Sequence, residues 1–544
     1  MWDTMKKMKL RTFASARAVN KCKLGDKILE LKEERALLTR FLLIQRARPE
    51  FMELSKAIGE FEFTAIPRSL FSAEGLMLIP TNKSALMNVT EVAADSQNGG
   101  IESAETEQVV FKVVIIDAMV EVQSLKKDEG IKNIGQLAER FCQQIEKKLR
   151  EANEGRILFD RYIQDSLKEQ TRKKRAKGID PIKFHVKESM DIRRINMKTL
   201  LSDTDTKEQL TILFKDTLLK KFRDSEMRII CVAGTTASSN HPGLLRDDMR
   251  EHDHEEADTL IPLHCLNAAT CYPGCSIVVH SVDTDVYVLL LEIYDSLSTS
   301  QLHMIVGRGK SQRIIDIGRC YEVLGTAKAK ALLGLHAFTG ADWGGKFSGI
   351  SKRKWVQNFL LLKDDDPIIT ALTDLGASLD SPPCQDIESI ERFVCSVYCK
   401  TSKSQSLKEL RWELFWKGKE AEKLPPTQAT LIPHVSRANY VCHCWKNCRR
   451  SMQALPTPEG HGWLSENDSY VPVLCLKKPA PNEMLELIKC GCKSDCATGH
   501  CLCRKNNLKC MPACSCEDCS NQECQSYFDD NDIDYDSDNS TDSD

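Results

Sequence analysis

Short apolar runs alternate with longer amphipathic segments through the middle of the chain. The runs are rich in β-branched residues, as is typical of strands that are buried on both faces; they cover residues 111–116, 157–159, 228–233 and 276–280. Patterns near helical spacing lie between them, in the segment that ends at residue 150 and at residues 166–177, 207–222 and 257–269. Strands alternating with helices predict an α/β domain with a largely parallel sheet flanked by helices.

The pattern changes on either side of this region. Residues 27–32 and 37–43 have apolar residues near helical spacing, so a helical and basic N-terminal region without evident chemistry is expected. Residues 363–430 also look helical, with Trp412 and Trp416 expected in a core. We therefore divide the chain into residues 1–100 (helical), 101–360 (α/β), 361–485 (helical and loop-rich), 486–525 (a small cysteine-rich domain) and 526–544 (a disordered acidic tail).

Acidic residues stand where the predicted strands end and where helices begin. Asp117, Asp160 and the pair Asp283 and Asp285 follow three of the strands. Ligands bind beyond the carboxyl ends of the strands in such sheets, so these side chains are expected to meet. Three further acids extend the set, two at the start of the helix near residue 257 and one after an apolar segment: Glu256, Asp258 and Asp342.

This acidic set indicates a site for divalent cations. Carboxylate oxygens suit Mg²⁺ or Mn²⁺, and two such ions can stabilise the attacking and leaving oxygens of a phosphodiester displacement. Acids gathered without a cation would repel one another. For single members a simpler interpretation stays open: Glu255, Glu256 and Asp258 could complement a helix dipole, and Asp283 and Asp285 could belong to a turn.

The set resembles the PIN-like fold of the flap endonuclease and 5′-exonuclease superfamily. The resemblance rests on an aspartate after the first strand, an aspartate before a basic helix, a Glu-x-acid pair, an Asp-x-Asp pair and a final aspartate after Leu-Leu-Gly: Asp117, Asp160, Glu256-Ala257-Asp258, Asp283-Thr284-Asp285 and Asp342. Glu-Glu-Ala-Asp-Thr, Asp-Thr-Asp-Val and Leu-His-Ala-Phe-Thr-Gly motifs bring it closer to an animal group associated with mobile elements. The resemblance covers roughly residues 100–360.

The resemblance implies a nuclease and assigns two further residues. Lys168 and Arg175 would contact the scissile phosphate, and basic residues within 346–354 would hold the DNA backbone. The alternatives are a solvated helix face for residues 168–177 and Glu255 as ligand in place of Glu256. A third interpretation is a zinc hydrolase site made of His252, His254 and Glu256, although no second histidine motif accompanies it.

The chain has 24 cysteines, and ten of them lie between Cys490 and Cys524. Nine follow a close spacing with repeated Cys-x-Cys: Cys490, Cys492, Cys496, Cys501, Cys503, Cys510, Cys514, Cys516 and Cys519. Tetrahedral Zn²⁺ needs four ligands, so nine thiolates can hold about three ions if three of them bridge. The spacing resembles the tesmin-type CXC domain, which implies a DNA-binding module of chromatin proteins. A disulfide knot is the alternative.

Charge and composition agree with a partner that is nucleic acid, with DNA expected. The net charge is −3, but residues 529–544 hold eight aspartates and no lysine or arginine, so the rest of the chain carries +5. No apolar stretch reaches the roughly 18 residues of a membrane span, and no signal-peptide pattern opens the chain, so no membrane and an intracellular, nuclear location are expected. The predicted function is a metal-dependent nuclease targeted by a zinc module; the alternative is an inactive PIN-like scaffold that binds chromatin or DNA through that module.

Overall fold

The structure is a computed structural model that divides into two compact units. The first holds Met1–Ala57, Phe61–Ala65 and Lys478–Asp544, and the second Ile58–Glu60 and Ile66–Lys477. We describe each unit by itself. The described residues are 20–24, 27–31, 37–38, 41–42, 45, 52–96, 111–127, 130–163, 166–175, 181–299, 301–420, 423–466, 469–481, 490–492, 496–497, 500–505, 510, 514–516 and 519–521.

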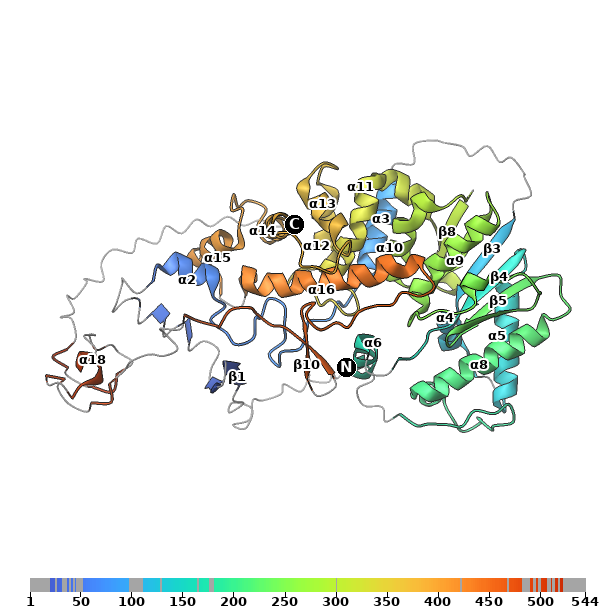
Figure 1. Cartoon of the computed structure of the whole chain (residues 1–544), viewed down its shortest axis with the longest axis horizontal. Helices are drawn as coiled ribbons and strands as arrows, with labels where there is room; N and C mark the ends of the chain where they lie inside the picture. The colour runs from blue at the N-terminus through green and yellow to red at the C-terminus, as the bar shows by residue number, and fades with distance from the viewer. Residues whose placement is uncertain are drawn as a thin grey trace, which may run out of the picture. The chain divides into compact units, whose positions relative to one another are not determined.

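A seven-stranded sheet organises the second unit (Figure 1). Its order is β6-β5-β4-β3-β7-β8-β9, with parallel pairing from β5 to β8 and antiparallel pairing at both edges. The strands are β3 (Lys112–Asp117), β4 (Glu154–Leu158), β5 (Arg228–Ala233), β6 (Thr236–Ser239), β7 (Ser276–His280), β8 (Gln301–Val306) and β9 (Arg313–Asp316). The predicted α/β fold with a largely parallel, helix-flanked sheet is confirmed.

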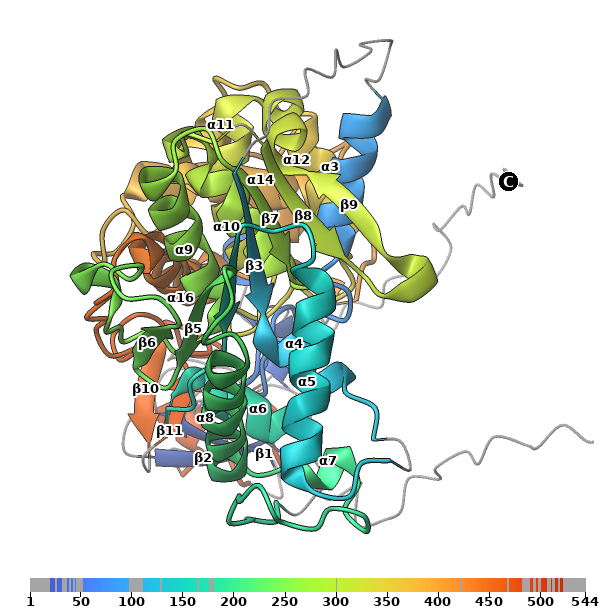
Figure 2. The same cartoon turned by 90° about the vertical axis from the view of Figure 1, so that its right-hand side faces the viewer.

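Helices cover both faces of the sheet, so its central strands are buried (Figure 2). The interiors of β3 and β7 are apolar, whereas β4 buries Glu154 and Arg156, which form an ion pair at 2.7 Å. On one face α5 and α8 pack over β3, β4 and β5; on the other α9 packs against β3, β4 and β7. In β3, Val113 to Ile116 are all at most 2% exposed. The helices of this half are α4 (Ala118–Ser124), α5 (Ile134–Lys148), α6 (Leu167–Arg175), α7 (Met197–Leu200), α8 (Thr204–Lys221), α9 (Ala257–Cys271), α10 (Thr284–Ile293) and α11 (Ile317–Phe338).

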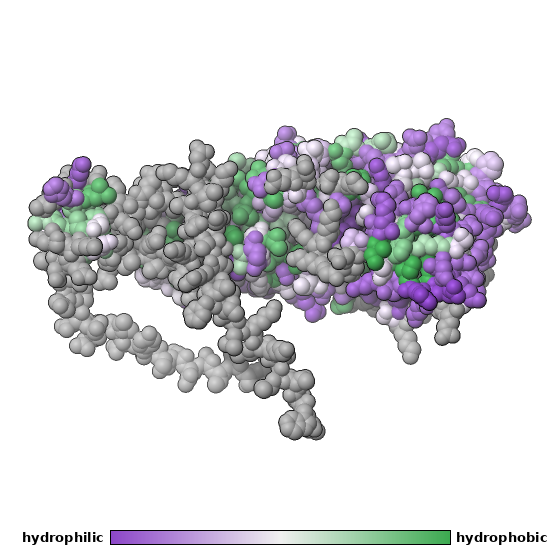
Figure 3. Space-filling view, turned by 90° about the horizontal axis from the view of Figure 1, so that it is seen from below, coloured by the Kyte–Doolittle hydropathy of each residue, from purple (hydrophilic) through white to green (hydrophobic). Residues whose placement is uncertain are grey.

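Helix α5 shows how the sequence sets this packing. The Asn133 side chain caps it by accepting a hydrogen bond from the Gln136 amide at 2.9 Å. Its buried residues include Ile134, Leu137 and Phe141, at helical spacing, so one stripe faces the sheet and the other faces solvent. On the face shown in Figure 3, hydrophilic residues surround an apolar area of the described surface.

More helices and a hairpin lie outside the sheet; they belong to the second unit except for the first four residues of α2, Leu54–Ala57, which belong to the first. Helix α16 packs against α11 and α14, and the segment before β3 supplies α3, which packs against α10, α11 and α12. The bounds are α2 (Leu54–Glu60), α3 (Ala85–Ser96), α12 (Lys352–Leu360), α13 (Pro367–Asp374), α14 (Cys384–Tyr398), α15 (Leu407–Trp416), α16 (Gln428–Lys446), β10 (Trp463–Glu466) and β11 (Ser469–Pro472).

The first unit holds a hairpin and a cysteine-rich segment. Strands β1 (Asn20–Leu24) and β2 (Lys27–Leu31) pair antiparallel, so a strand stands over Lys27–Leu31 where a helix was expected at 27–32. The cysteine-rich segment contains α18 (Leu502–Lys505). The acidic tail, 526–544, lies outside the described residues.

Three other features differ from the sequence-based expectations or add to them. Strands β6, β8 and β9 were not predicted. Trp416 is 74% exposed and Trp412 is half-buried, so the core position expected for Trp416 is wrong. Among the described residues, no helix has the length and apolar character needed to cross a membrane.

The close approach of α11 and α13 yields a prediction. A Cβ atom added at Gly334 would lie 1.9 Å from the Leu372 carbonyl oxygen, so Gly334→Ala must push these helices apart. We expect the free energy of unfolding to fall by about 1–3 kcal/mol, measured by urea denaturation. Glu322→Ala, at an exposed position of the same helix, is the control; equal stability of the two variants would contradict the prediction.

Candidate metal centre

The register of the sheet brings three of the predicted acids to one edge. Asp117 is the last residue of β3 and pairs with Leu158 of β4, two residues before Asp160. On the other side of β3, Ile116 pairs with His280 of β7, three residues before Asp283. The carboxyl ends of three neighbouring parallel strands therefore carry one aspartate each.

Helix starts add further carboxylates at the same edge. Glu256 precedes the first residue of α9 and Asp258 lies in its first turn; Asp283 and Asp285 have the same places on α10. The Asp160 Oδ1 accepts a hydrogen bond from the Ala257 amide at 2.9 Å, which joins the end of β4 to the start of α9. Helix N-termini carry partial positive charge and favour carboxylates.

Two of the aspartates also cap helices: Asp117 caps α4 and Asp283 caps α10. Asp117 Oδ1 accepts from the Met119 and Val120 amides at 3.1 and 3.2 Å, and its Oδ2 accepts from the Ser281 hydroxyl at 3.3 Å. Asp283 Oδ1 accepts from the Asp285 amide at 3.0 Å. These bonds fix the orientation of both carboxylates, and caps of this kind need no neighbouring acids.

Convergence of several acids separates this site from simple capping. Asp258, Asp283 and Asp285 each place an oxygen within 4.8 Å of the other two, a grouping that could hold a metal ion. Burial, with Asp283 next to it, raises the pKa of Asp258 well above its usual value. Burial and the neighbouring Asp160 raise the pKa of Asp117 to about 7. An oxygen-only donor set that repels itself in this way fits a hard divalent cation.

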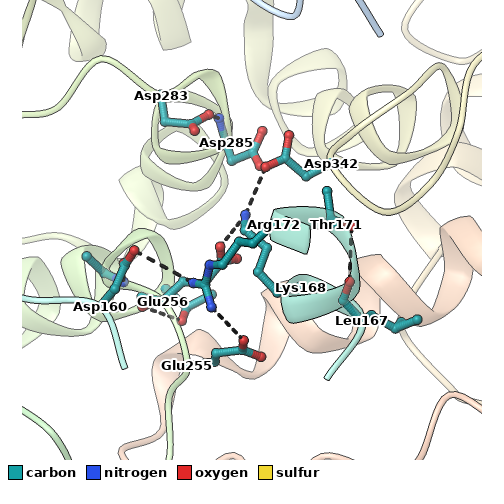
Figure 4. Close-up of polar contacts among 12 residues, drawn as sticks. Asp160, Leu167, Lys168, Thr171, Arg172, Glu255, Glu256, Asp283, Asp285 and Asp342 are labelled. Carbon is teal, nitrogen blue, oxygen red and sulfur yellow. Dashed lines mark hydrogen bonds and ion pairs between the residues drawn. The ribbon is translucent and has the colours of Figure 1, made fainter. Parts of the chain in front are cut away.

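Glu256 belongs to this cluster, whereas Glu255 faces away from it. Burial raises the pKa of Glu256 to about 7, although Lys168 acts in the opposite direction. Glu255 instead accepts from the Ser166 hydroxyl at 2.7 Å and pairs with Arg172 at 3.1 Å (Figure 4). The structure therefore places Glu256, and not Glu255, among the converging acids.

Lys168 reaches into the cluster from α6. Its Nζ lies 2.8 Å from Asp342 Oδ2 and also pairs with Glu256, and its side chain is 8% exposed (Figure 4). Burial disfavours its charge, but Glu256 and Asp342 outweigh burial and raise its pKa well above the usual value. The solvated-face alternative thus does not hold at Lys168.

Arg172, one turn further along α6, takes part in the site, although the sequence did not single it out. Its guanidinium lies 3.7 Å from Asp160 Oδ2 and 4.8 Å from the centre of the Tyr162 ring. The side chain of Arg175, which the sequence assigned to the phosphate, lies outside the described residues. Residues four apart lie on the same face of a helix, so the spacing of Lys168 and Arg172 could have indicated that Arg172 also belongs to the site.

Lys83, in the segment before α3, is the main residue missed. Its Nζ lies 2.7 Å from Asp342 Oδ1 and 3.2 Å from Oδ1 of both Asp283 and Asp285. Burial works against its charge, yet these aspartates raise its pKa. No chemistry was expected before residue 100, and a single lysine there carries no motif that would have revealed it.

Two of the acids are ionised because of these cations. Burial opposes the charge on Asp285, but Lys83 and a hydrogen bond from His336 hold its pKa well below the usual value. The His336 Nε2–Asp285 Oδ1 distance is 2.8 Å. Burial lowers the pKa of His336 to about 4, so the ring is neutral and donates its N–H to the carboxylate. Lys168 and Lys83 likewise lower the pKa of Asp342 against the effect of burial.

A cavity of about 840 Å³, termed here the acidic cavity, opens onto the cluster. It is lined by acids of the cluster and, toward α6 and α8, by Tyr162, Arg172 and Lys207. Lys207 Nζ lies 5.1 Å from the Tyr162 ring centre. The acidic cavity thus combines a carboxylate floor with a cationic and aromatic wall. Among the predicted acids, it is lined by Asp117, Asp160, Glu256, Asp258, Asp283 and Asp342.

The zinc hydrolase interpretation does not fit. Both ring nitrogens of His254 are engaged, with the Thr259 hydroxyl at 2.9 Å and the Arg450 carbonyl at 2.7 Å. Glu256 is directed toward Lys168. The ring centroids of His252 and His254 lie 5.8 Å apart, and the two rings meet edge to face.

The cysteines of the first unit form a compact cluster. Sγ–Sγ distances of 3.6–3.7 Å join Cys490 to Cys496, Cys510 and Cys516, and Cys503 to Cys514. Two sulfurs on one tetrahedral Zn²⁺ are about 3.8 Å apart, given Zn–S bonds of about 2.3 Å, whereas a disulfide measures about 2.05 Å. The disulfide alternative is therefore not adopted by these residues.

Three overlapping sets of four thiols could each hold a metal ion. They are Cys490, Cys510, Cys514 and Cys516; Cys490, Cys496, Cys501 and Cys510; and Cys496, Cys510, Cys516 and Cys519. Cys490, Cys496 and Cys516 each belong to two sets, as expected of thiolates that bridge two ions, and Cys510 belongs to all three. Cys492 packs half-buried against the cluster.

Comparisons with known proteins do not define a family. No protein-family model and no curated protein sequence matches the chain. Solved structures that match include a crystal structure of the bacteriophage T5 flap endonuclease, a pseudo-enzyme–product complex with DNA and metal ions. The match has 12% identity and a TM-score of 0.30, and covers 62% of this chain and 99% of the other. A TM-score of this size leaves function to be argued from the side chains of the site.

The position of Lys83 gives a prediction about stability. Lys83→Met leaves three carboxylates without their shared cation, so we expect unfolding in EDTA to become easier by about 3 kcal/mol. Urea denaturation measures the change. The control is Lys408→Met, which removes a lysine that is 51% exposed and has a single ion pair with Glu60 at 3.3 Å; we expect about 0.5 kcal/mol or less. A Lys83 variant no less stable than the control would show that the ion pairs do not form.

Proposed function

We propose that the second unit is a PIN-like nuclease that uses Mg²⁺ or Mn²⁺ to cleave phosphodiester bonds of nucleic acid, with DNA as the expected substrate. The observation that carries the proposal is the convergence of carboxylates from separate segments at one edge of a parallel sheet, with Asp258, Asp283 and Asp285 close enough to share a cation. Such a cluster is unfavourable to bury unless it binds positive charge.

The donor set fits the proposed ion because it consists of carboxylate oxygens. The residues that would hold cations are Asp117, Asp160, Glu256, Asp258, Asp283, Asp285 and Asp342. Bound divalent ions activate water and neutralise charge on a phosphodiester. His336 orients Asp285 through a hydrogen bond to its Oδ1, as residues that support a metal ligand commonly do.

The cationic wall of the acidic cavity would receive the substrate backbone. Lys168 and Arg172 project from one helix toward the acids, so both can meet phosphate oxygens. Lys346 and Arg353 line a further cavity of about 370 Å³ near the start of α12, where they would bind backbone phosphates away from the cleaved bond. Phosphate contacts of this kind position a strand without reading its sequence.

We further propose that the cysteine cluster is a CXC-type zinc module that binds about three Zn²⁺ and takes the protein to DNA in the nucleus. The overlapping sets of thiols support the zinc count. The described cations Arg504 and Lys505 can offset the charge of the thiolates and meet the DNA backbone. Membership of the animal group associated with mobile elements is part of the same proposal.

One observation favours the alternative, a scaffold without catalysis. Lys83 and Lys168 together pair with four of the acids: Glu256, Asp283, Asp285 and Asp342. A site neutralised by its own lysines could hold its shape without cations and bind nucleic acid only through its basic surfaces. The two functions differ in whether added Mg²⁺ or Mn²⁺ produces cleavage.

The deciding experiment is a cleavage assay with single-stranded, duplex and flap substrates of DNA and RNA. We expect Mg²⁺- or Mn²⁺-dependent cleavage that falls on the order of a thousandfold in Asp283→Asn/Asp285→Asn, because two cation ligands lose their charge. Asp247→Asn/Asp248→Asn, an exposed aspartate pair outside the site, is the matched control and should keep full activity. Wild-type protein that cleaves none of the substrates would establish the scaffold alternative.

Cation affinity should depend on pH, because Asp117 and Glu256 have pKa values of about 7. At pH 6 both are mainly protonated, so a cation must displace protons; at pH 8 both are already ionised. We expect Mn²⁺ affinity to rise about tenfold between pH 6 and pH 8 for each of these carboxyls that binds. Calorimetric titrations in buffers of different ionisation enthalpy measure affinity and proton release, and equal affinities at both pH values would refute this.

Zinc content tests the module. Elemental analysis of the full chain should give about three Zn²⁺ per molecule. Cys510→Ser should lose more than one of them, since its thiol belongs to all three sets, whereas Cys384→Ser, at an exposed cysteine outside the cluster, should lose none. Loss of a single ion from the Cys510 variant would show that this thiolate does not bridge.

A further inference from the structure

The ammonium group of Lys83 lies where three carboxylates converge. Its Nζ is 2.7 Å from an oxygen of Asp342 and 3.2 Å from an oxygen of both Asp283 and Asp285. These three carboxylates lie together at one side of the cluster (Figure 4). An ammonium group has three N–H donors, so each carboxylate has one donor to accept. The hydrogen-bonding capacity of Lys83 is therefore used within the protein.

Lys83 differs in this respect from the cations that face the acidic cavity. Lys168, Arg172 and Lys207 line that cavity, where a substrate would enter, whereas Lys83 is not one of its lining residues. The Lys83 side chain is 18% exposed. Its position suits a counter-charge to the aspartates better than a contact to the phosphate of a substrate.

Helix α3 fixes Lys83 in this position. The Asn82 side chain accepts a hydrogen bond from the first amide of α3 at 3.1 Å, so the helix begins directly after the lysine. The helix packs against α10, and the Thr90 hydroxyl lies 2.8 Å from the Tyr287 hydroxyl of α10. Lys83 is therefore positioned by packing against the same helix that begins with the aspartate pair.

Two of the three aspartates that Lys83 contacts also belong to the grouping that could hold a metal ion. That grouping consists of Asp258, Asp283 and Asp285. Lys83 contacts Oδ1 of both Asp283 and Asp285, and His336 donates to the same oxygen of Asp285 at 2.8 Å. A divalent ion and the ammonium group would compete for these oxygens, because two cations that share ligands repel each other.

The other four acids come from the ends of β3 and β4 and from the start of α9: Asp117, Asp160, Glu256 and Asp258. Lys168 pairs with Glu256, and Arg172 lies 3.7 Å from Asp160. Asp117 accepts its hydrogen bonds from two backbone amides and the Ser281 hydroxyl, which are neutral donors. A divalent ion is needed on this side, whereas the side that Lys83 contacts already holds a positive charge.

We propose that Lys83 takes the place of one of two divalent ions, so that the acids bind a single Mg²⁺ or Mn²⁺ beside a fixed ammonium charge. The inference rests on the proposed function and deepens it, because it states what the site contains when it is loaded. The residues left to hold the ion are Asp117, Asp160, Glu256 and Asp258. Lys83 is a positioning residue for Asp283, Asp285 and Asp342.

The test counts the Mn²⁺ ions bound by the full-length protein at pH 8, using titration calorimetry. We expect one ion per chain in the wild type and two in Lys83→Ala, because loss of the ammonium group frees the carboxylates for a second ion. Mn²⁺ prefers oxygen ligands, so the cysteine cluster does not add to the count.

Three further variants separate charge from side-chain size. Lys83→Gln keeps part of the stem without the charge and should also bind two ions, whereas Lys83→Arg keeps the charge and should bind one. Lys408→Ala removes a lysine that is 51% exposed and should bind one ion, as the wild type does.

Electron paramagnetic resonance shows whether two bound ions are neighbours. Two Mn²⁺ ions about 3.5–4 Å apart, as in a two-metal site, couple magnetically and give a spectrum unlike that of a single ion. We expect the spectrum of a single ion from the wild type and the coupled spectrum from Lys83→Ala.

Three results would overturn the inference: coupled ions or no ion in the wild type, a single ion in both Lys83→Ala and Lys83→Gln, or failure of both variants to fold in Mn²⁺, where a second ion should replace the lost charge. The readouts need no turnover. Counts of one and two uphold the inference even if the wild type cleaves nothing, and a wild type that cleaves with two coupled ions refutes it while the nuclease stands.

Discussion

Repulsion among carboxylates at the carboxyl edge of the sheet is the constraint on which the second unit depends. A parallel sheet brings strand ends together whatever residues they carry, and in this chain three of them carry aspartates. The folded state therefore needs positive charge at that edge. The N-termini of α9 and α10, Lys83 before α3, and Lys168 and Arg172 of α6 supply this charge.

Sequence analysis predicts the parts of this arrangement that follow from local pattern. The interiors of β3 (Val113–Ile116) and β7 (Ile277–Val279) are apolar because helices cover both faces, and that pattern is visible in the chain. The acids at their ends follow from the topological rule for α/β sheets. The edge strands β6 and β9 have four residues each, and β8, which lies between β7 and β9, alternates buried and partly exposed residues, so all three give a weaker signal than a fully buried strand.

Contacts between distant residues could not be predicted in the same way. Lys83 lies 200 residues from Asp283 along the chain, and nothing near it marks it as part of a site. Arg172 and Arg175 are both basic residues of one predicted helix, and the sequence pattern alone does not tell which of them reaches the acids.

The place of Lys83 has a consequence for how the protein is made. Synthesis proceeds from the N-terminus, so the lysine emerges before any of the acids with which it pairs, and Asp342 emerges last. The site is complete only after Asp342 has left the ribosome, while residues 343–477 of the second unit are still to follow. A shortened chain beginning at β3 would retain the sheet and all seven acids and would lack this lysine altogether, so its behaviour would not represent that of the whole protein.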